Sequence, residues 1–400
     1  MNVRLSGGRV LDPGSGIDEV RDVFLIGGVI GTEAAWTGGE EVDCTGRWIC
    51  PGFVDLYADL ADHFDAESAL RGGFTTVACL PLGQPEILRD RATGLAEIPV
   101  RVLPVGALTV DGSALAEMGL LIEAGAVAIS QGRQTVSDSA SLLNALSYAA
   151  RFDRPVLLRP TDESLEASGV VRAGPQGLRV GLRQVPAEAE AIGVWQAALL
   201  AGRCGARVHL THLSTALGVR ALRGARAAGL PVTGSTTAAH LAAANVPPYA
   251  GSSRFLPPLG DERDRAALAD GLRDGTLLAV ATDHRPCTPV RQQVPIASAV
   301  AGAIGFETAL PLVLSALDGA DAIRALTAGP ASVMGISATL TPGAVADVVL
   351  IDPSAEWTFR AEDDASRGSN SALDGTGLRG RVDRLWVGGR LLVTPRAPAR

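Results

Sequence analysis

The chain has 400 residues, of which 47% are hydrophobic and 20% charged, and its formal net charge is −8 at pH 7. This composition excludes intrinsic disorder, and the acidic balance excludes binding to nucleic acid through a basic face. No apolar run is long enough to span a membrane and the N-terminus lacks a signal-peptide core, so we expect a cytoplasmic protein that binds no membrane. The five cysteines form no CxxC pair, which argues against a disulfide framework and a cysteine zinc site.

Both ends of the chain are rich in short strand-like runs separated by glycine turns. These runs are Val3–Leu5, Val10–Leu11 and Val23–Ile30 near the N-terminus, and Asp347–Ile351, Trp357–Phe359 and Leu385–Val393 near the C-terminus. The last run predicts a β-hairpin that turns at Gly388-Gly389. Both ends are therefore expected to be β-rich, unlike the middle of the chain.

Between residues 50 and 340, strand-like runs alternate with helical runs rich in Ala, Leu and Arg. The strand candidates are Cys50–Leu56, Thr75–Leu80, Val100–Gly106, Ala126–Ser130, Pro155–Arg159, Arg207–His212, Pro231–Ser235 and Leu277–Thr282. This alternation predicts an α/β fold of the closed (β/α)8 TIM-barrel type. The competing doubly wound sheet lacks its GxGxxG turn after an early strand. Helices are expected over Glu188–Cys204 and Leu213–Ala228, and a mobile loop at the barrel mouth over Thr161–Val185.

The segment Pro51–Leu60 (PGFVDLYADL) is the most informative part of the sequence. It resembles the first barrel strand of metal-dependent amidohydrolases, which ends in His-x-His. Further segments with this resemblance follow in family order: RGGFTTV (71–77), GAVAIS (125–130), HLTHLST (209–215), VATDHRP (280–286), GFETALPL (305–312), TPGAVADVVLIDP (341–353) and SRGSNSALDG (366–375). Over nearly its whole length the chain resembles dihydroorotases of the kind that work alongside aspartate transcarbamoylase.

The resemblance implies an amidohydrolase-type (β/α)8 barrel over residues 51–340 and a small β-sandwich domain built from residues 1–50 and 341–400. It also implies a chemistry, which is the reversible ring closure of carbamoyl aspartate to dihydroorotate. In that family, one or two zinc ions at the C-terminal ends of the strands generate hydroxide and polarise the amide. An aspartate on the eighth strand shuttles the proton, while arginine and asparagine hold the substrate carboxylate.

Most of that machinery is replaced in this chain. The replaced metal-site positions are Tyr57 and Asp59 for His-x-His, Ser130-Gln131 for the bridging acid or carboxylated lysine, and Arg159 for the histidine that ends the fifth strand. The chain contains no lysine at all. Only His212 and Asp283 match the family's metal ligands, and Asp283 is also the position of the proton shuttle.

The positions that hold the substrate carboxylate are replaced as well. They fall on Ala61, Leu82, Gln84, Leu256 and Gly260. The sequence therefore predicts a catalytically inactive dihydroorotase homologue of pyrimidine biosynthesis. The resemblance implies a structural role, in which an oligomeric assembly holds aspartate transcarbamoylase. A ligand sensor that uses the vacated pocket has no support in the sequence.

An active zinc-dependent dihydroorotase, or a related cyclic amidohydrolase, is the alternative. Asp59 would then complete a degenerate mononuclear site with His212 and Asp283, because catalytic zinc normally has three protein ligands. An inward-pointing Arg159 opposes this: a guanidinium ~4 Å from a dication costs about 8 kcal/mol at an effective dielectric constant of ~20. We therefore expect no cofactor, and we predict that Arg159 pairs with Asp59, Asp283 or both.

The other candidate polar residues have structural interpretations. His209 points away from His212 by strand alternation. His240 keeps the second position of a family His-His pair that binds no metal, and His284 is expected to orient Asp283 or cap the next segment. Cys287 stands where a histidine is usual and receives no role. The carboxylate of Glu190, near the start of a helix, is explained by the helix dipole.

Overall fold

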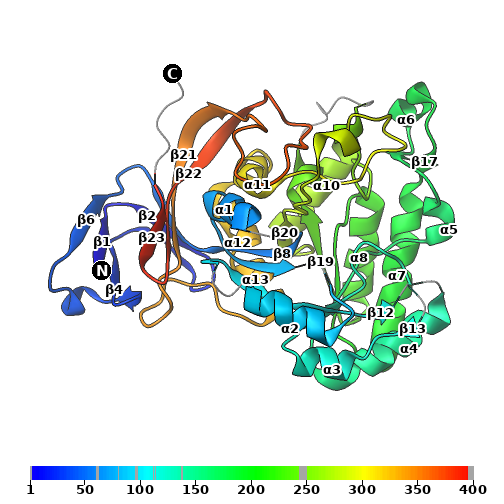
Figure 1. The fold of residues 1–400 in the computed structure, drawn as a ribbon, viewed down its shortest axis with the longest axis horizontal. Coiled ribbons are helices and arrows are strands. Elements are labelled where there is room, and N and C mark those ends of the chain that lie inside the picture. The colour runs from blue at the N-terminus through cyan, green and yellow to red at the C-terminus, as the bar shows by residue number, and fades with distance from the viewer. Residues whose placement is uncertain are drawn as a thin grey trace.

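The computed structural model describes residues 2–59, 63–79, 81–94, 98–110, 112, 114–136, 138–242 and 250–394. Strands from both chain ends lie on one side of the molecule, and alternating strands and helices lie on the other (Figure 1). The terminal strands form two sheets, in the orders β5-β4-β1-β6 and β23-β22-β21-β7-β2-β3. Their bounds are β1 Val3–Ser6, β2 Arg9–Asp12, β3 Ile17–Val20, β4 Val23–Ile26, β5 Val29–Gly31, β6 Glu40–Asp43, β7 Trp48–Pro51, β21 Val348–Thr358, β22 Gly377–Val387 and β23 Arg390–Val393.

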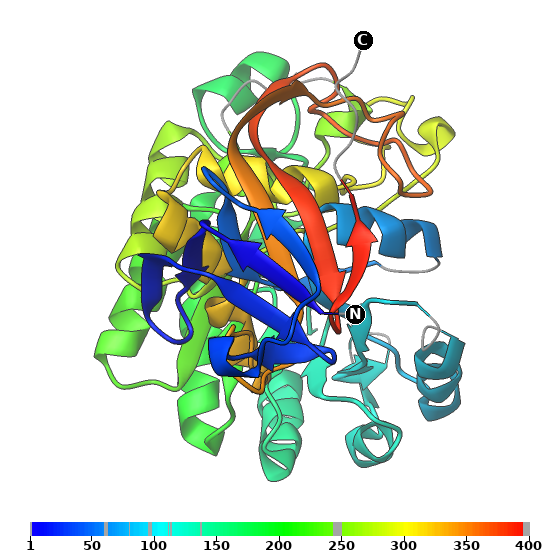
Figure 2. The same ribbon diagram turned by 90° about the vertical axis from the view of Figure 1, so that its left-hand side faces the viewer.

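The two chain ends are joined by shared sheet pairing and a shared core. Figure 2 shows the N-terminal strands in blue beside the C-terminal strands in orange and red. Strand β21 pairs antiparallel with β7, and Val3, Leu5, Ile49 and Trp386 are buried in one apolar cluster. The predicted hairpin at Gly388-Gly389 is confirmed as the β22–β23 turn, where both glycines have positive φ (54° and 75°). Such a turn favours glycine because a Cβ atom is strained at positive φ.

The middle of the chain contains the eight expected parallel strands in chain order. They are β8 Phe53–Ala58, β9 Phe74–Cys79, β10 Arg101–Leu103 with β11 Val105–Ala107, β14 Ala128–Ser130, β15 Val156–Leu158, β18 Val208–Leu210, β19 Val232–Thr237 and β20 Ala279–Ala281. These strands form two sheets, β8-β9-β10 and β11-β14-β15-β18-β19-β20. Within each sheet, every strand pairs in parallel with the strand that follows it in this order. This order excludes the doubly wound sheet, whose strand order reverses at a switch point.

The predicted closed barrel is not present as one hydrogen-bonded ring. Pro104 divides the third strand, so that β10 pairs with β9 while β11 pairs with β14. Proline has no N–H to donate, which breaks the ladder at this point. A single bridge between Leu82 and Gly106 spans the junction. The parallel strands therefore form two separate sheets, β8-β9-β10 and β11-β14-β15-β18-β19-β20, which we call two arcs, and not one continuous sheet.

The second junction, between β8 and β20, is filled by a buried carboxyl group. Ala58 bridges His284 there, and the Asp55 carboxylate accepts hydrogen bonds from the Thr282 amide (3.0 Å), the Thr282 hydroxyl and the Tyr57 amide (3.2 Å). Burial raises the pKa of Asp55 to about 7, although these hydrogen bonds act in the opposite direction. Asp55 thus links the first strand to the eighth.

Helices pack around the parallel strands (Figure 1). They are α1 His63–Arg71, α2 Pro85–Gly94, α3 Met118–Glu123, α4 Ser139–Ala149, α5 Glu163–Glu166, α6 Pro175–Val180, α7 Ala187–Cys204, α8 Ala216–Ala227, α9 Ala238–Leu241, α10 Glu262–Arg273, α11 Phe306–Leu314, α12 Gly319–Leu326 and α13 Ala328–Met334. The helices expected over Glu188–Cys204 and Leu213–Ala228 are confirmed as α7 and α8. Within the described ranges, no helix is both long and apolar enough to cross a membrane.

The segment Thr161–Val185, predicted as a loop, contains regular structure. Helices α5 and α6 lie within it, together with the paired strands β16 (Val171–Arg172) and β17 (Gln184–Val185). The prediction failed because short helices in a segment rich in Gly and Ser have no long apolar period to reveal them. A second small pair, β12 (Thr109–Val110) with β13 (Ala114–Leu115), follows β11.

Candidate functional site

Four side chains meet at the C-terminal ends of the parallel strands. Tyr57 lies on β8, Arg133 follows β14, His212 follows β18 and Asp283 follows β20. Nη2 of Arg133 lies 2.5 Å from Oδ1 of Asp283, and its guanidinium carbon lies 5.7 Å from the centre of the Tyr57 ring. The Tyr57 ring meets the His212 ring edge-on, with centroids 4.5 Å apart. Nε2 of His212 lies 3.2 Å from Oδ1 of Asp283 but is not oriented for a hydrogen bond.

The backbone holds His212 and Asp283 in strained conformations. Both residues have left-handed backbone angles, with φ values of 60° and 50°. Such angles cost a non-glycine residue free energy and persist only where the surroundings enforce them. Both residues end strands at the same edge, so these turns aim their side chains at a common point.

The turn after His212 is held by Glu190 of α7. Its buried carboxylate accepts hydrogen bonds from the amides and hydroxyls of Ser214 and Thr215, at 2.6–3.0 Å. Burial raises the pKa of Glu190, and these partners together with Arg172 oppose that rise. The interpretation of Glu190 from the helix dipole is therefore incomplete, because its carboxylate fixes the loop that carries His212.

The electrostatics of the site favour an ion pair over proton transfer. Burial by itself raises the pKa of the Asp283 carboxyl, but Arg133 and His212 outweigh this effect and lower the pKa below its usual value. Asp283 is therefore an anion bound to a permanent cation. Burial raises the pKa of Tyr57, whose hydroxyl has no hydrogen-bond partner among the described residues. Neither group is poised to exchange a proton near neutral pH.

Asp59 does not join His212 and Asp283. Its carboxylate forms an ion pair with Arg367 at 3.3 Å, and Arg367 also lies 3.3 Å from the buried Asp65 of α1. Among the described residues, no three His, Cys, Asp or Glu side chains are grouped so as to hold a metal ion. In this structure Asp59 is thus paired with Arg367, in the loop between β21 and β22, and does not lie with His212 and Asp283.

Arg159 also has a different partner from the one predicted. Its guanidinium makes a bidentate ion pair with Glu166 of α5, at 2.7 and 2.9 Å, and its Nε donates to the carbonyl of Arg133 at 3.2 Å. The predicted pairing with Asp59 or Asp283 is wrong. Glu166 lies in the segment that the sequence marked as a loop, so this neighbour was invisible. Arg133, not Arg159, neutralises Asp283.

Three further histidines, His209, His240 and His284, and Cys287 are engaged in structural contacts. His209 Nδ1 lies 2.8 Å from the Thr233 hydroxyl, and burial lowers the pKa of His209 to about 3. His240 contacts the Thr237 hydroxyl and the Pro257 carbonyl, at 2.7 and 3.1 Å, with its pKa likewise lowered to about 3 by burial. His284 stacks on the Phe306 ring, with centroids 4.2 Å apart, and the Cys287 amide donates to Asn370.

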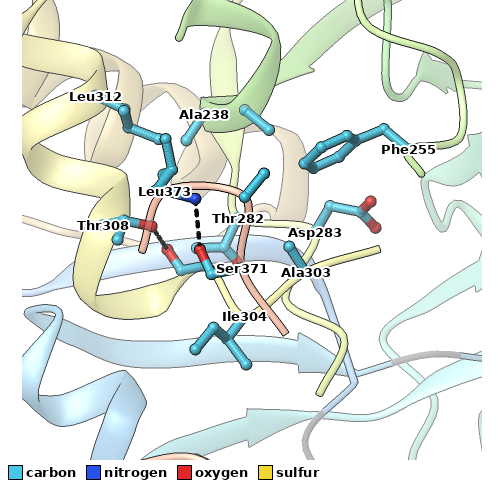
Figure 3. Close-up of a pocket in the computed structure, with 13 residues that line it drawn as sticks. Ala238, Phe255, Thr282, Asp283, Ala303, Ile304, Thr308, Leu312, Ser371 and Leu373 are labelled. Atoms are coloured by element: carbon cyan, nitrogen blue, oxygen red, sulfur yellow. Dashed lines mark hydrogen bonds between the residues drawn. The ribbon is translucent and has the colours of Figure 1, made fainter. Parts of the chain in front are cut away.

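The space on one side of Asp283 is almost filled. A cavity of about 30 Å³ lies there, between α9, α11 and the loop at residues 371–373. Figure 3 shows the Asp283 carboxylate pointing away from Thr308 and Ser371, which line this cavity. Such a volume has room for about one water molecule and not for an organic substrate.

The side chains present do not fit the zinc ion that the family fold implies. Only two of the usual three ligands remain, and the Arg133 guanidinium already neutralises one of them. A divalent ion about 4 Å from this guanidinium would be repelled by about 8 kcal/mol at an effective dielectric constant of ~20. Arg133 was not among the site residues predicted from the sequence. It follows Ser130-Gln131, the position of the family's bridging ligand, and this proximity was the one signal that could have identified it.

Known proteins resemble this chain over nearly its whole length. The model of the dihydro-orotase-like family matches residues 46–217, and that of the amidohydrolase family matches residues 190–392. A dihydroorotase from Anaeromyxobacter sp. (strain K) is 38% identical, with 97% of each chain covered, and one from Pelotomaculum thermopropionicum is 37% identical, with 99% of each covered. The solved L-hydantoinase (dihydropyrimidinase) from Arthrobacter aurescens shares the fold, with a TM-score of 0.85 at 20% identity over 98% of this chain and 96% of that one. The chain therefore belongs to the dihydroorotase family of the amidohydrolase superfamily.

Proposed function

We propose that this chain is a non-catalytic dihydroorotase homologue that serves as a structural partner of aspartate transcarbamoylase in pyrimidine biosynthesis. The observation that carries the non-catalytic part is the ion pair between Arg133 and Asp283 at the strand ends. The guanidinium places a fixed positive charge beside the carboxylate that matches the family's proton shuttle. Tyr57, which stands at the first His-x-His position, packs against His212, the one histidine that matches a family metal ligand.

The partner in this proposal follows from the loss of chemistry together with the resemblance of the sequence. The fold, its core and its strand-end turns are kept, whereas most of the metal-ligating side chains of the family are replaced. Binding to another protein is the simplest function that would preserve such a fold. The sequence segments resemble dihydroorotases that work alongside aspartate transcarbamoylase, which makes that enzyme the proposed partner in a larger oligomer. The curated relatives are named dihydroorotase, and the loss of catalysis is proposed for this chain from its own side chains.

We expect the protein, purified without chelator, to contain less than about 0.1 zinc per chain, because two ligands and a guanidinium do not retain the ion. Elemental analysis by mass spectrometry measures this content. With added zinc, we expect the wild-type protein to hydrolyse dihydroorotate no faster than the His212→Ala variant does. The control is His209→Ala, which removes a histidine near the site that is not one of the matched metal ligands. Zinc that is bound only adventitiously to histidine would be lost equally in both variants.

The alternative is an active mononuclear enzyme, and the 3.2 Å distance between His212 and Asp283 is the observation in its favour. About one zinc per chain, lost in His212→Ala and Asp283→Ala but kept in His209→Ala, would establish it. Turnover that disappears with Asp283→Ala would do the same. Either result would overturn the non-catalytic proposal.

The partner is tested by gel filtration of this protein mixed with aspartate transcarbamoylase from the same organism. We expect the two to elute together at micromolar concentrations, earlier than either protein alone. The control is the same run in high salt, which distinguishes a charge-dominated contact from an apolar one. Separate elution at both salt concentrations would count against the scaffold and leave the zinc result standing.

A further inference from the structure

A larger cavity lies beside the ion-paired cluster, and the proposed scaffold role does not require it. Its volume is about 470 Å³, which is within the range of small-molecule sites. It opens between the loops that follow β9, β11 and β14, and Tyr57 and Arg133 form part of its wall. The cavity therefore occupies the mouth of the strand array while avoiding the filled space beside Asp283.

The wall of this cavity has an apolar side and a polar side. Leu82, Ile87 and Val110 form part of the apolar side, and residues Ile87 and Val110 are 46% and 45% exposed. Large exposed apolar side chains that line a concave surface are typical of ligand sites. On the polar side, the Thr109 hydroxyl donates to the Gln131 side chain at 2.8 Å. Such a wall matches an occupant with one apolar and one polar end.

The charge on the polar side is positive and incompletely neutralised. Arg133 is paired with Asp283, whereas Arg285 forms no ion pair with any residue that the structure describes. Nη1 of Arg285 donates to the Ala301 carbonyl at 2.9 Å, which leaves the rest of the guanidinium for another acceptor. Arg133 and Arg285 both line the cavity, so an anion bound there would face two guanidinium groups.

Arg285 is also held in place before any ligand arrives. The Asn370 amide donates to the carbonyl of Arg285 at 2.8 Å and to the carbonyl of Gly302 at 3.1 Å. Gly302 packs against the Arg285 stem so closely that an added Cβ would lie 2.9 Å from Cβ and Cδ of the arginine. A donor fixed in this way loses little conformational entropy on binding.

We propose that this cavity binds a small organic acid with an apolar body. The carboxylate pairs with Arg285, and the body lies against Ile87 and Val110. The ligand has a single carboxylate because the cavity offers one guanidinium, that of Arg285, without an ion-pair partner among the described residues. The rest of the ligand is an uncharged ring or branched chain because it would lie against the apolar side of the cavity. The chain would then act as a receptor for such an acid, whether or not it also binds another protein.

The test is calorimetric titration of the full-length protein with phenylacetate as the probe. We expect a Kd below about 1 mM, and binding at least about tenfold weaker for phenylacetamide, which lacks the charge. Arg285→Gln is expected to weaken phenylacetate binding at least about tenfold, whereas the same change at the exposed Arg21 leaves it unaltered. Ile87→Asp, a substitution at an exposed position that should not disturb folding, is expected to weaken binding by charge repulsion.

Several results would overturn the proposal. Absence of heat and of ligand-observed NMR saturation transfer at about 10 mM phenylacetate would exclude the site. Equal binding by the wild type and Arg285→Gln, or by the acid and its amide, would exclude the charge assignment. Inorganic phosphate binding as tightly as phenylacetate would exclude the apolar body. These outcomes leave the zinc and gel-filtration results untouched.

Discussion

Replacement of Glu166 by alanine is expected to lower the free energy of unfolding by about 3–5 kcal/mol. The side chains of Arg159 and Glu166 are only 4% and 10% exposed, and two hydrogen bonds join them. Removal of the carboxylate leaves a buried guanidinium without its counter-charge, and this unpaired charge is the main source of the loss. Urea unfolding followed by circular dichroism measures the effect.

The double variant Arg159→Met with Glu166→Met separates charge burial from packing. It is expected to lose much less stability than Glu166→Ala, because neither charge remains and both side chains still fill space. Asp270→Ala removes an exposed ion pair with Arg273 and is expected to change the stability by less than about 1 kcal/mol. If Glu166→Ala unfolds at the wild-type urea concentration, the bidentate pair does not exist in solution.

Asp55 is expected to make the protein less stable as the pH rises from about 4 to about 7. The pKa of Asp55 in the folded protein is about 7, against an unfolded value of 3.8. Between these values the unfolded chain has released a proton that the folded chain retains, so the free energy of unfolding falls with increasing pH and then levels off. A difference of about three pKa units corresponds to about 4 kcal/mol.

Asp55→Asn is the variant that isolates this effect. The asparagine carbonyl can accept from the amides of Tyr57 and Thr282, and its NH2 group can donate to the Thr282 hydroxyl, so the link between β8 and β20 is kept. The stability gained by the variant relative to the wild type should grow between pH 5 and pH 8. Asp18→Asn, at an exposed carboxylate, serves as the control. Parallel stability curves for the wild type and Asp55→Asn would show that Asp55 is not protonated in the folded state.

The array of parallel strands could be predicted from the sequence because its signal is local. Each of the eight predicted runs overlaps one of the parallel strands, and α7 begins one residue from its predicted start. Apolar runs bounded by turn residues reveal strands without knowledge of their neighbours. The hairpin at Gly388-Gly389 was predictable for the same reason, since its turn type favours glycine.

The partners of the charged residues were not predictable in this way. Asp59 pairs with Arg367, 308 positions away, and Asp283 pairs with Arg133, 150 positions away. Coulomb attraction depends on distance in space, and several arginines were equally plausible partners along the chain. Arg159 illustrates the consequence: its strand-end position was predicted, but its partner came from a segment taken for a loop.

By itself, the sequence determined the family and the strand and helix pattern, because these depend on residue type, order and spacing. The tertiary structure alone decided that the strands form two arcs, that Arg133 neutralises Asp283 and that a cavity remains beside Arg285. These features depend on how distant segments pack, since a ladder junction, an ion pair and a cavity each need groups that meet only after folding.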